Sequence, residues 1–113
     1  MSERGKKPEG YCSADKYLTI ISTKWTAHIV WVIGQHNEIR FGQIQKQLAL
    51  VSSKVLSERL RILKKEGFIS RRPEETVPIT VYYGLTSKGV ELFEVIDVIV
   101  KKADFWDGKL VSV

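Results

Sequence analysis

Seven basic side chains cluster in the middle of the chain and could bind a polyanion. They are Lys54, Arg59, Arg61, Lys64, Lys65, Arg71 and Arg72. Only two acids, Glu58 and Glu66, lie between Ser52 and Arg72, so this segment holds the entire net charge of +5 of the 113-residue chain. Because clustered Lys and Arg bind phosphate, the pattern predicts a nucleic-acid partner. The alternative is chance clustering on a solvated helix.

The sequence offers few residues for thiol or imidazole chemistry. Cys12 is the only cysteine, which excludes an intrachain disulfide and a cysteine-rich zinc site. His28 and His36 stand eight residues apart, distant from Cys12 in sequence, and no glycine-rich phosphate loop or catalytic signature accompanies them. We therefore expect no catalytic residue, no metal and no cofactor, and predict that the chain is not an enzyme.

A helix must position the basic residues. Ser52 and Ser53 are typical N-caps and Gly67 is a typical terminator, which predicts a helix between them. Its inward stripe consists of Leu56, Leu60 and Leu63. At 100° per residue, the opposite side carries Lys54, Ser57, Glu58, Arg61 and Lys65.

The flanking segments predict further elements. We expect helices from Ser13 to a break at Ser22-Thr23, over about residues 24–35, and over 41–48, the second being apolar nearly all round and hence central. Residues 68–72 and 79–85 predict a two-stranded hairpin around a polar turn, and Thr86 caps a last helix running to about Asp104. Four helices, a hairpin and a helix in this order are typical of a winged helix-turn-helix.

The expected fold class is mainly α with a small β-hairpin (α+β), a winged helix-turn-helix with N- and C-terminal dimerisation helices. We predict a flexible basic tail over residues 1–10, one domain over 11–105 and a C-terminal tail over 106–113, in keeping with a hydrophobic fraction of 43%. The apolar run at 29–33 is far shorter than the ~20 residues of a membrane span, and no signal peptide is evident. We expect a cytoplasmic protein without a membrane partner.

The predicted recognition helix and wing supply the candidate DNA contacts. An α-helix fits the major groove with its N-terminal residues at base edges, and lysines further along reach phosphate. Arg71 and Arg72 on the wing reach the backbone or a minor groove; the alternative is a pair of solvated edge-strand charges. Arg59, at the margin of the leucine stripe, makes either an ion pair or a DNA contact. The predicted DNA-binding residues are Ser52, Ser53, Lys54, Ser57, Arg61, Lys64, Lys65, Arg71 and Arg72.

The last helix has more apolar residues than one docking face needs. One stripe holds Leu92, Ile96, Ile99, Ala103 and Trp106, while Phe93, Val95, Val98 and Val100 lie outside it. The surplus predicts a homodimer, whose interface we assign to Leu92, Phe93, Ile96, Ile99, Val100 and Trp106. The alternative is that the N-terminal helix covers this surplus within one chain. A two-fold dimer places recognition helices about 34–36 Å apart on a palindromic site.

Over about residues 11–105 several short motifs occur in a specific order. They are Cys12, Lys24-Trp25-Thr26, Arg40-Phe41-Gly42-Gln43-Ile44, Ser53-Lys54-Val55-Leu56-Ser57-Glu58-Arg59-Leu60, Gly67-Phe68-Ile69 with Arg71, and Tyr82-Tyr83-Gly84-Leu85-Thr86-Ser87-Lys88-Gly89. With this set the chain resembles the HxlR-type winged helix-turn-helix regulators, relatives of the MarR-like regulators. The resemblance implies a dimeric bacterial or archaeal transcription regulator.

The resemblance also draws attention to Cys12, because several members of that family sense electrophiles or oxidants through a cysteine at this position. A thiol at a helix N-terminus is favoured as the thiolate; Lys16 one turn on adds to this effect and Asp15 opposes it. Without a second cysteine, the products are an intersubunit disulfide, a mixed disulfide or an adduct. The alternatives are an inert thiol and a response to a different signal.

Together these features predict a sequence-specific DNA-binding transcription regulator, with repression the commoner outcome for a small domain without an activation region. Its expected partners are double-stranded DNA, a second copy of the chain, and an oxidant or small-molecule effector. The alternative is a winged helix used only for protein–protein contact. A module that binds only proteins does not need its entire net positive charge to be concentrated on the recognition helix and wing.

Overall fold

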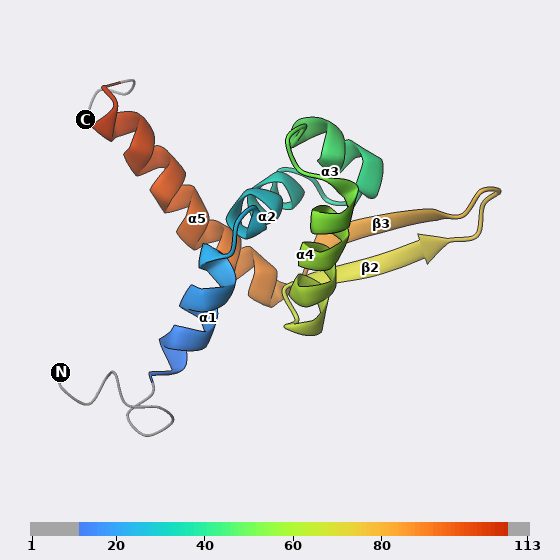
Figure 1. The fold of residues 1–113 in the computed structure, drawn as a ribbon, viewed down its shortest axis with the longest axis horizontal. Helices are drawn as coiled ribbons and strands as arrows, with labels where there is room; N and C mark the ends of the chain where they lie inside the picture. The colour runs from blue at the N-terminus through green and yellow to red at the C-terminus, as the bar shows by residue number, and fades with distance from the viewer. Residues whose placement is uncertain (1–11, 109–113) are drawn as a thin grey trace.

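The computed structural model describes residues 12–108, which form five helices and three strands (Figure 1). The helices are α1 (Ser13–Ser22), α2 (Thr26–Gly34), α3 (Phe41–Gln47), α4 (Ser53–Lys65) and α5 (Ser87–Trp106). The strands are β1 (Ile39–Arg40), β2 (Ile69–Glu74) and β3 (Thr80–Leu85). This is the predicted α+β winged helix fold. The predicted N-terminal tail lies outside the described residues, as do residues 109–113, and α5 extends to Trp106 at the start of the predicted C-terminal tail.

Helix α2 forms the centre of the core. Ile29, Val30 and Ile33 have no exposed surface, and α2 contacts α1, α3, α5 and β3. A short helix that is apolar on nearly every side needs such neighbours, as its sequence predicts. It begins at Thr26, later than predicted, because Trp25 adopts a left-handed backbone conformation with φ of 77° that separates α1 from α2.

The sheet has a third strand that the sequence did not reveal. β1 pairs antiparallel with β3, and β3 pairs with β2, in the order β1-β3-β2. The two residues of β1 are too few for a period-2 pattern, and their partner strand starts about 40 residues later. The sequence pattern therefore predicts no strand between α2 and α3. Ile39 on β1 is nevertheless 1% exposed and belongs to the core.

The apolar residues of α5 divide between the chain's own core and the surface. Leu92 and Ile96, predicted at a subunit interface, are 8% and 6% exposed and belong to the chain's own core, and Ile96 also borders a groove between α2 and α5. Of the other predicted interface residues, Phe93 and Val100 are half-buried, whereas Ile99 and Trp106 are 55% and 70% exposed. Further exposed apolar side chains on α5 are Val90, Val95, Val98 and Phe105.

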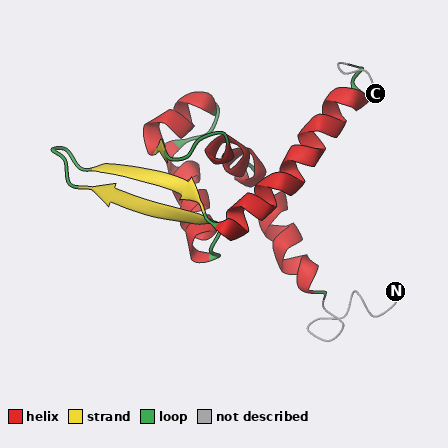
Figure 2. Ribbon diagram, turned by 180° about the vertical axis from the view of Figure 1, so that it is seen from behind, coloured by secondary structure: helices red, strands yellow, loops and turns green. Residues whose placement is uncertain are grey.

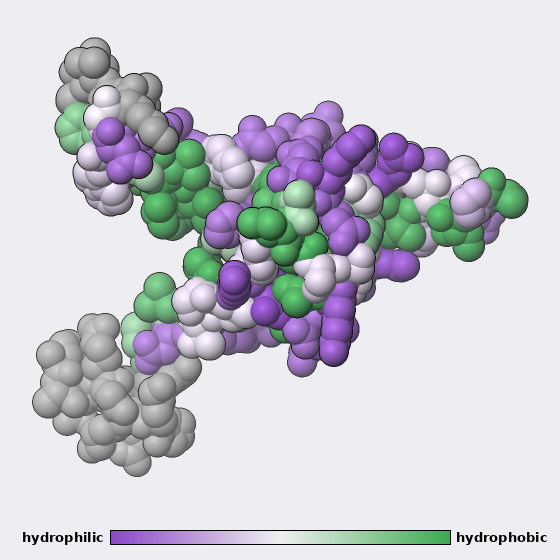
Figure 3. Space-filling view, turned by 45° about the horizontal axis from the view of Figure 1, so that its top comes forward, coloured by the Kyte–Doolittle hydropathy of each residue, from purple (hydrophilic) through white to green (hydrophobic). Residues whose placement is uncertain are grey.

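The arrangement of α1 explains why these side chains stay exposed. In Figures 1 and 2, the N-terminal end of α1 and the C-terminal end of α5 project from the rest of the structure in different directions. Figure 3 shows apolar surface along the projecting part of α5. Tyr17 of α1 packs against Phe68, ring centroids 6.1 Å apart, beside the N-terminal part of α5. Helix α1 therefore does not cover the exposed apolar side chains along the whole length of α5.

The turn after α4 connects three helices. The Lys16 ammonium of α1 lies 3.0 Å from the Glu66 carboxylate. Lys88 of α5 donates to the Glu66 carbonyl at 2.8 Å, and the Thr86 hydroxyl donates to the Gly67 carbonyl at 2.6 Å. Gly67 has a φ of +82°, which favours glycine and ends α4 as predicted. The C-terminus of α4 is thus held by both α1 and α5.

Along residues 12–108, we find no helix with the length and apolar character that a membrane crossing requires.

Gly89→Ala tests the close packing of α5 on this turn. A Cβ at position 89 would overlap the carbonyl oxygen of Phe68. We expect the substitution to lower the free energy of unfolding by about 1–3 kcal/mol, as overpacking does. Chemical denaturation at one fixed protein concentration measures the change.

The matched control is Gly42→Ala in α3, where an added Cβ meets nothing within 4 Å. Replacing an unhindered helical glycine stabilises a helix by up to about 1 kcal/mol. Equal effects of the two substitutions would contradict the packing around Gly89.

Candidate nucleic-acid interface

The leucine face of α4 determines which side chains point outward. Leu56, Leu60 and Leu63 are at most 2% exposed. The Ser52 hydroxyl caps the helix by accepting a hydrogen bond from the Val55 amide at 3.1 Å, as the sequence predicts. The outer face then presents Lys54, Ser57, Arg61 and Lys64, at spacings of three, four and three residues.

Helix α3 holds the N-terminal end of α4. The Gln45 amide donates to the Ser53 hydroxyl at 2.8 Å, and Val51, in the connection between the helices, is 3% exposed. Phe41, Ile44 and Leu48 pack on the core, as their spacing predicts. These contacts join α3 and α4 as a helix-turn-helix. Ser52, Ser53 and Lys54 are exposed at its tip.

A hollow of about 250 Å³ lies between α4 and the sheet. It brings together cations from two elements, with Arg61 and Lys64 coming from α4 and Arg71 from β2. Its other lining residues are Phe41, Ser57, Leu60 and Tyr83. Four of the predicted DNA-binding residues, Ser57 and the three cations, therefore converge. Lys65 is exposed at the last turn of α4 and does not line this hollow.

The cations of this region fall into two groups. Among residues 12–108, Lys54, Arg61, Lys64, Lys65 and Arg71 form no ion pair. Arg59 belongs to the second group, since it bonds to Glu58 at 2.7 Å and to the Lys24 carbonyl at 2.9 Å, with its side chain 16% exposed. Of the two roles that its sequence position left open, the structure favours the ion pair.

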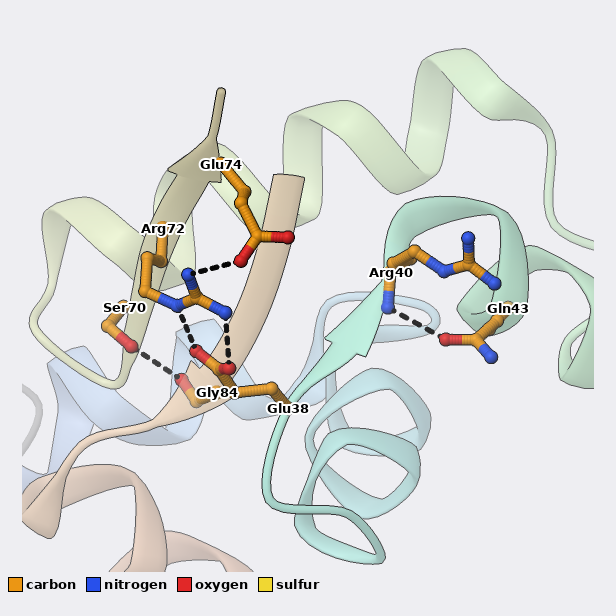
Figure 4. A network of polar contacts seen from close by, with 7 residues as sticks. All are labelled: Glu38, Arg40, Gln43, Ser70, Arg72, Glu74 and Gly84. Atoms are coloured by element: carbon orange, nitrogen blue, oxygen red, sulfur yellow. Dashed lines mark hydrogen bonds and ion pairs between the residues drawn. The ribbon is translucent and has the colours of Figure 1, made fainter. Parts of the chain in front are cut away.

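Arg72 also belongs to the paired group and lies apart from the hollow. Successive residues of a strand point to opposite faces, so Arg71 faces α4 and Arg72 faces away. Arg72 pairs with Glu38 and Glu74, as Figure 4 shows, and these acids hold the pKa of Arg72 above its ordinary value. Its hydrogen bond to Glu38 lowers the pKa of that carboxyl. The predicted DNA contact of Arg72 stays a prediction.

Two cations that the sequence analysis missed extend the basic surface onto α3. Arg40 and Lys46, with Gly42 and Gln43, line a second hollow of about 340 Å³. The Arg40 amide donates to the Gln43 side chain at 3.1 Å and so caps the start of α3 (Figure 4). In a helix-turn-helix the first helix crosses the phosphate backbone of DNA. The position of Arg40 and Lys46 at the start of this helix and within it is therefore the signal that could identify them from the sequence.

The other candidate residues lie outside this surface. Cys12 is half-buried and precedes α1 as its N-cap residue. His28 and His36 are exposed, and no group of three His, Cys, Asp or Glu side chains in residues 12–108 could hold a metal. Trp25 and Trp31 pack against the core, whereas Trp106 is exposed rather than packed.

The geometry is that of a winged helix-turn-helix, and comparison with known proteins gives its family. The model of the HxlR-like helix-turn-helix family matches residues 20–109. The chain belongs to the HxlR-like helix-turn-helix family. The family expected from the motifs is therefore confirmed.

The relatives of this HxlR-like protein carry names that describe them as transcriptional regulators. It is 36% identical to the uncharacterised HTH-type transcriptional regulator YvaP of Bacillus subtilis, over 81% of this chain and 84% of YvaP. The reduced form of the B. subtilis transcriptional regulator YodB superimposes with a TM-score of 0.71 at 28% identity, covering 82% of this chain and 91% of that one. A Porphyromonas gingivalis protein assigned to the MarR family superimposes with a TM-score of 0.73 at 30% identity, with 93% and 99% covered.

Proposed function

We propose that this HxlR-like protein is a dimeric, sequence-selective DNA-binding regulator, most simply a repressor that occupies a palindromic operator. One observation carries the proposal. Arg61, Lys64 and Arg71 converge from α4 and β2 around one hollow and form no ion pair with any described residue. Buried or paired cations would serve the fold, whereas exposed cations that pair with no described residue, two on the outer face of α4 and one on the wing, suit phosphate.

The positions on α4 suggest a division of roles. Ser52, Ser53, Lys54 and Ser57 stand at the N-terminal end, the part of a recognition helix that meets base edges. Arg61 follows one turn later, where it can reach a guanine edge or a phosphate. The phosphate contacts fall to five cations on four elements: Lys64 and Lys65 at the C-terminal end of α4, Arg71 on β2, Arg40 on β1 and Lys46 on α3.

A winged helix used only for protein contact is the competing function. Such a surface is usually apolar at its centre and depleted in lysine. The outer face of α4 instead carries only polar and charged side chains at positions 54, 57, 61 and 64. This composition favours DNA.

A second copy of the chain is the proposed occupant of the exposed face of α5. A groove of about 210 Å³ between α2 and α5 is lined by Ala27, His28, Trp31, Ile96, Ile99 and Val100. Helix α5 also exposes the apolar side chains Val95, Val98, Phe105 and Trp106. An exposed apolar stripe of this extent marks an interface. A two-fold arrangement then presents two α4 helices to a palindrome.

Cys12 is the proposed site of redox control. YodB has been solved in a reduced form and after treatment with diamide, a thiol oxidant. Here two Cys12 thiols, one from each subunit, would give two electrons and two protons to diamide and form a disulfide. Because Cys12 is the only cysteine of the chain, a disulfide between two copies of the protein requires one thiol from each subunit.

Substitution of the convergent arginines tests DNA binding. We expect wild type to bind DNA from upstream of its own gene in preference to scrambled DNA. Arg61→Ala and Arg71→Ala should each weaken binding about tenfold and reduce the slope of log affinity against log salt by about one. Fluorescence anisotropy across a salt series measures both quantities.

Lys101→Ala is the control, because Lys101 lies on α5 and pairs with Asp97 at 2.9 Å. It should bind as wild type does. Equal losses in all three variants would indicate a general charge effect and would count against the α4 site.

Ile99→Glu tests the dimer. A carboxylate in the α2–α5 groove cannot be buried by a partner without a large desolvation cost, so we expect the variant to be monomeric. Val77→Glu, at a fully exposed position of the wing, should remain dimeric. Sedimentation equilibrium distinguishes the two, and an Ile99→Glu dimer would refute the proposed interface.

Cys12→Ser tests redox control. Diamide should abolish selective DNA binding by wild type and leave Cys12→Ser unaffected, as read by anisotropy with and without the oxidant. Non-reducing electrophoresis should show a disulfide-linked dimer only for wild type. Loss of binding in both proteins would exclude Cys12 as the sensor.

A further inference from the structure

The wing is joined to the start of β1 by one ion pair of favourable geometry. Glu38 lies directly before β1 and Arg72 lies on β2, the two outer strands of the sheet. The Nε and Nη2 atoms of Arg72 donate to the two carboxylate oxygens of Glu38, both at 2.8 Å. As Figure 4 shows, the two side chains meet across β3 near Gly84. A two-pronged contact of this kind fixes the orientation of both groups.

The surroundings of the pair restrict it further. A Cβ on Gly84 would come within 3.0 Å of the Asn37 carbonyl oxygen, so glycine lets the backbone just before Glu38 lie close against β3. The Arg72 guanidinium lies 4.8 Å from the centre of the Tyr82 ring. Its remaining nitrogen, Nη1, lies 3.4 Å from Glu74. The guanidinium therefore has a carboxylate on each side and an aromatic ring beneath it.

Arg71, the adjacent residue, faces the hollow beside α4. The pairing of β2 with β3 directs Arg71 toward α4, and because neighbouring strand residues project to opposite faces, the bond of Arg72 to Glu38 restrains β2 from its other face in that orientation. We propose that Glu38 and Arg72 are positioning residues for DNA binding: the Glu38–Arg72 pair holds the wing so that Arg71 faces α4, and Arg72 does not itself bind DNA. This inference rests on the function proposed above.

The charges on Arg72 argue against a direct DNA contact. A phosphate would have to displace a carboxylate that already makes two hydrogen bonds, and it would leave the Glu38 charge unpaired beside the DNA. An exposed pair contributes little to the free energy of unfolding, and both side chains are more than a third exposed. The pair therefore acts mainly by keeping the wing ordered before binding, which reduces the ordering cost of association.

Glu38→Gln separates positioning from contact, because the two roles predict opposite changes. If Arg72 is a DNA contact restrained by Glu38, then neutralising Glu38 releases a cation. Binding should then tighten and the salt slope should rise by about one. If the pair positions Arg71, selective binding should weaken about three- to tenfold, because association must then order the loosened wing and its Arg71 side chain, and the slope should not rise.

Arg72→Lys is the second variant. Lysine keeps the positive charge but lacks the planar fork that bonds both carboxylate oxygens. Positioning predicts the same loss as in Glu38→Gln, whereas a point-charge contact predicts binding close to that of wild type. The control is Glu75→Gln, which removes one negative charge from the same wing at an exposed residue that forms no ion pair within residues 12–108. It should not weaken binding.

The measurement is fluorescence anisotropy of the full chain with its upstream DNA and with scrambled DNA, across a salt series. Thermal unfolding of each variant confirms that it is folded. Weaker selective binding in both Glu38→Gln and Arg72→Lys, with Glu75→Gln unimpaired, supports the proposal. Unchanged or tighter binding by either variant overturns it. If wild type fails to distinguish the two DNAs, the proposed function itself fails, which is a separate result.

Discussion

The burial of one face of α4 is the constraint on which the rest of the structure depends. Leu56, Leu60 and Leu63 enter a core built around α2, and each such side chain stabilises the fold by about 1.5–3 kcal/mol on burial. Turning α4 by one residue position, 100°, would bring them to the surface. The helix therefore has one permitted rotation, and the identity of the outward residues follows from it.

The second part of the basic surface depends on the sheet. Arg71 faces α4 only because β2 keeps its pairing with β3, and a slip of one residue would exchange its place with that of Arg72. The two arginines are chemically alike and adjacent in sequence, yet one is exposed in a hollow and the other is bonded to two carboxylates. Identical residue types acquire different tasks from strand geometry alone.

The features predicted from the sequence are those encoded by local patterns. The cap at Ser52, the leucine stripe and the terminating Gly67 all lie within one helix, and the structure has them where the pattern placed them. The alternation of side chains along β2 is equally local, and it gives Arg71 and Arg72 opposite directions although their shared charge predicts one DNA-binding pair.

The features that were missed depend on contacts between distant residues. β1 is visible only with its partner strand present, and the Glu38–Arg72 bond spans 34 positions. Leu92 and Ile96 look the same in sequence as Ile99, and only the packing of α5 on the body separates core from surface. Arg40 was missed because the charge was counted along the chain and not over the folded surface.

The turn at Glu66 and Gly67 has a mechanical consequence. It fastens the end of α4 to the first turn of α5, a helix of 20 residues and roughly 30 Å. At that length, a tilt of about 10° displaces the far end by roughly 5 Å. Leu92 and Ile96 also pack α5 on the core, so a tilt of α5 within an assembly would carry α4 with it. In any assembly held by the far end of α5, a small change in crossing angle would be read out as a change in the distance between the two α4 helices.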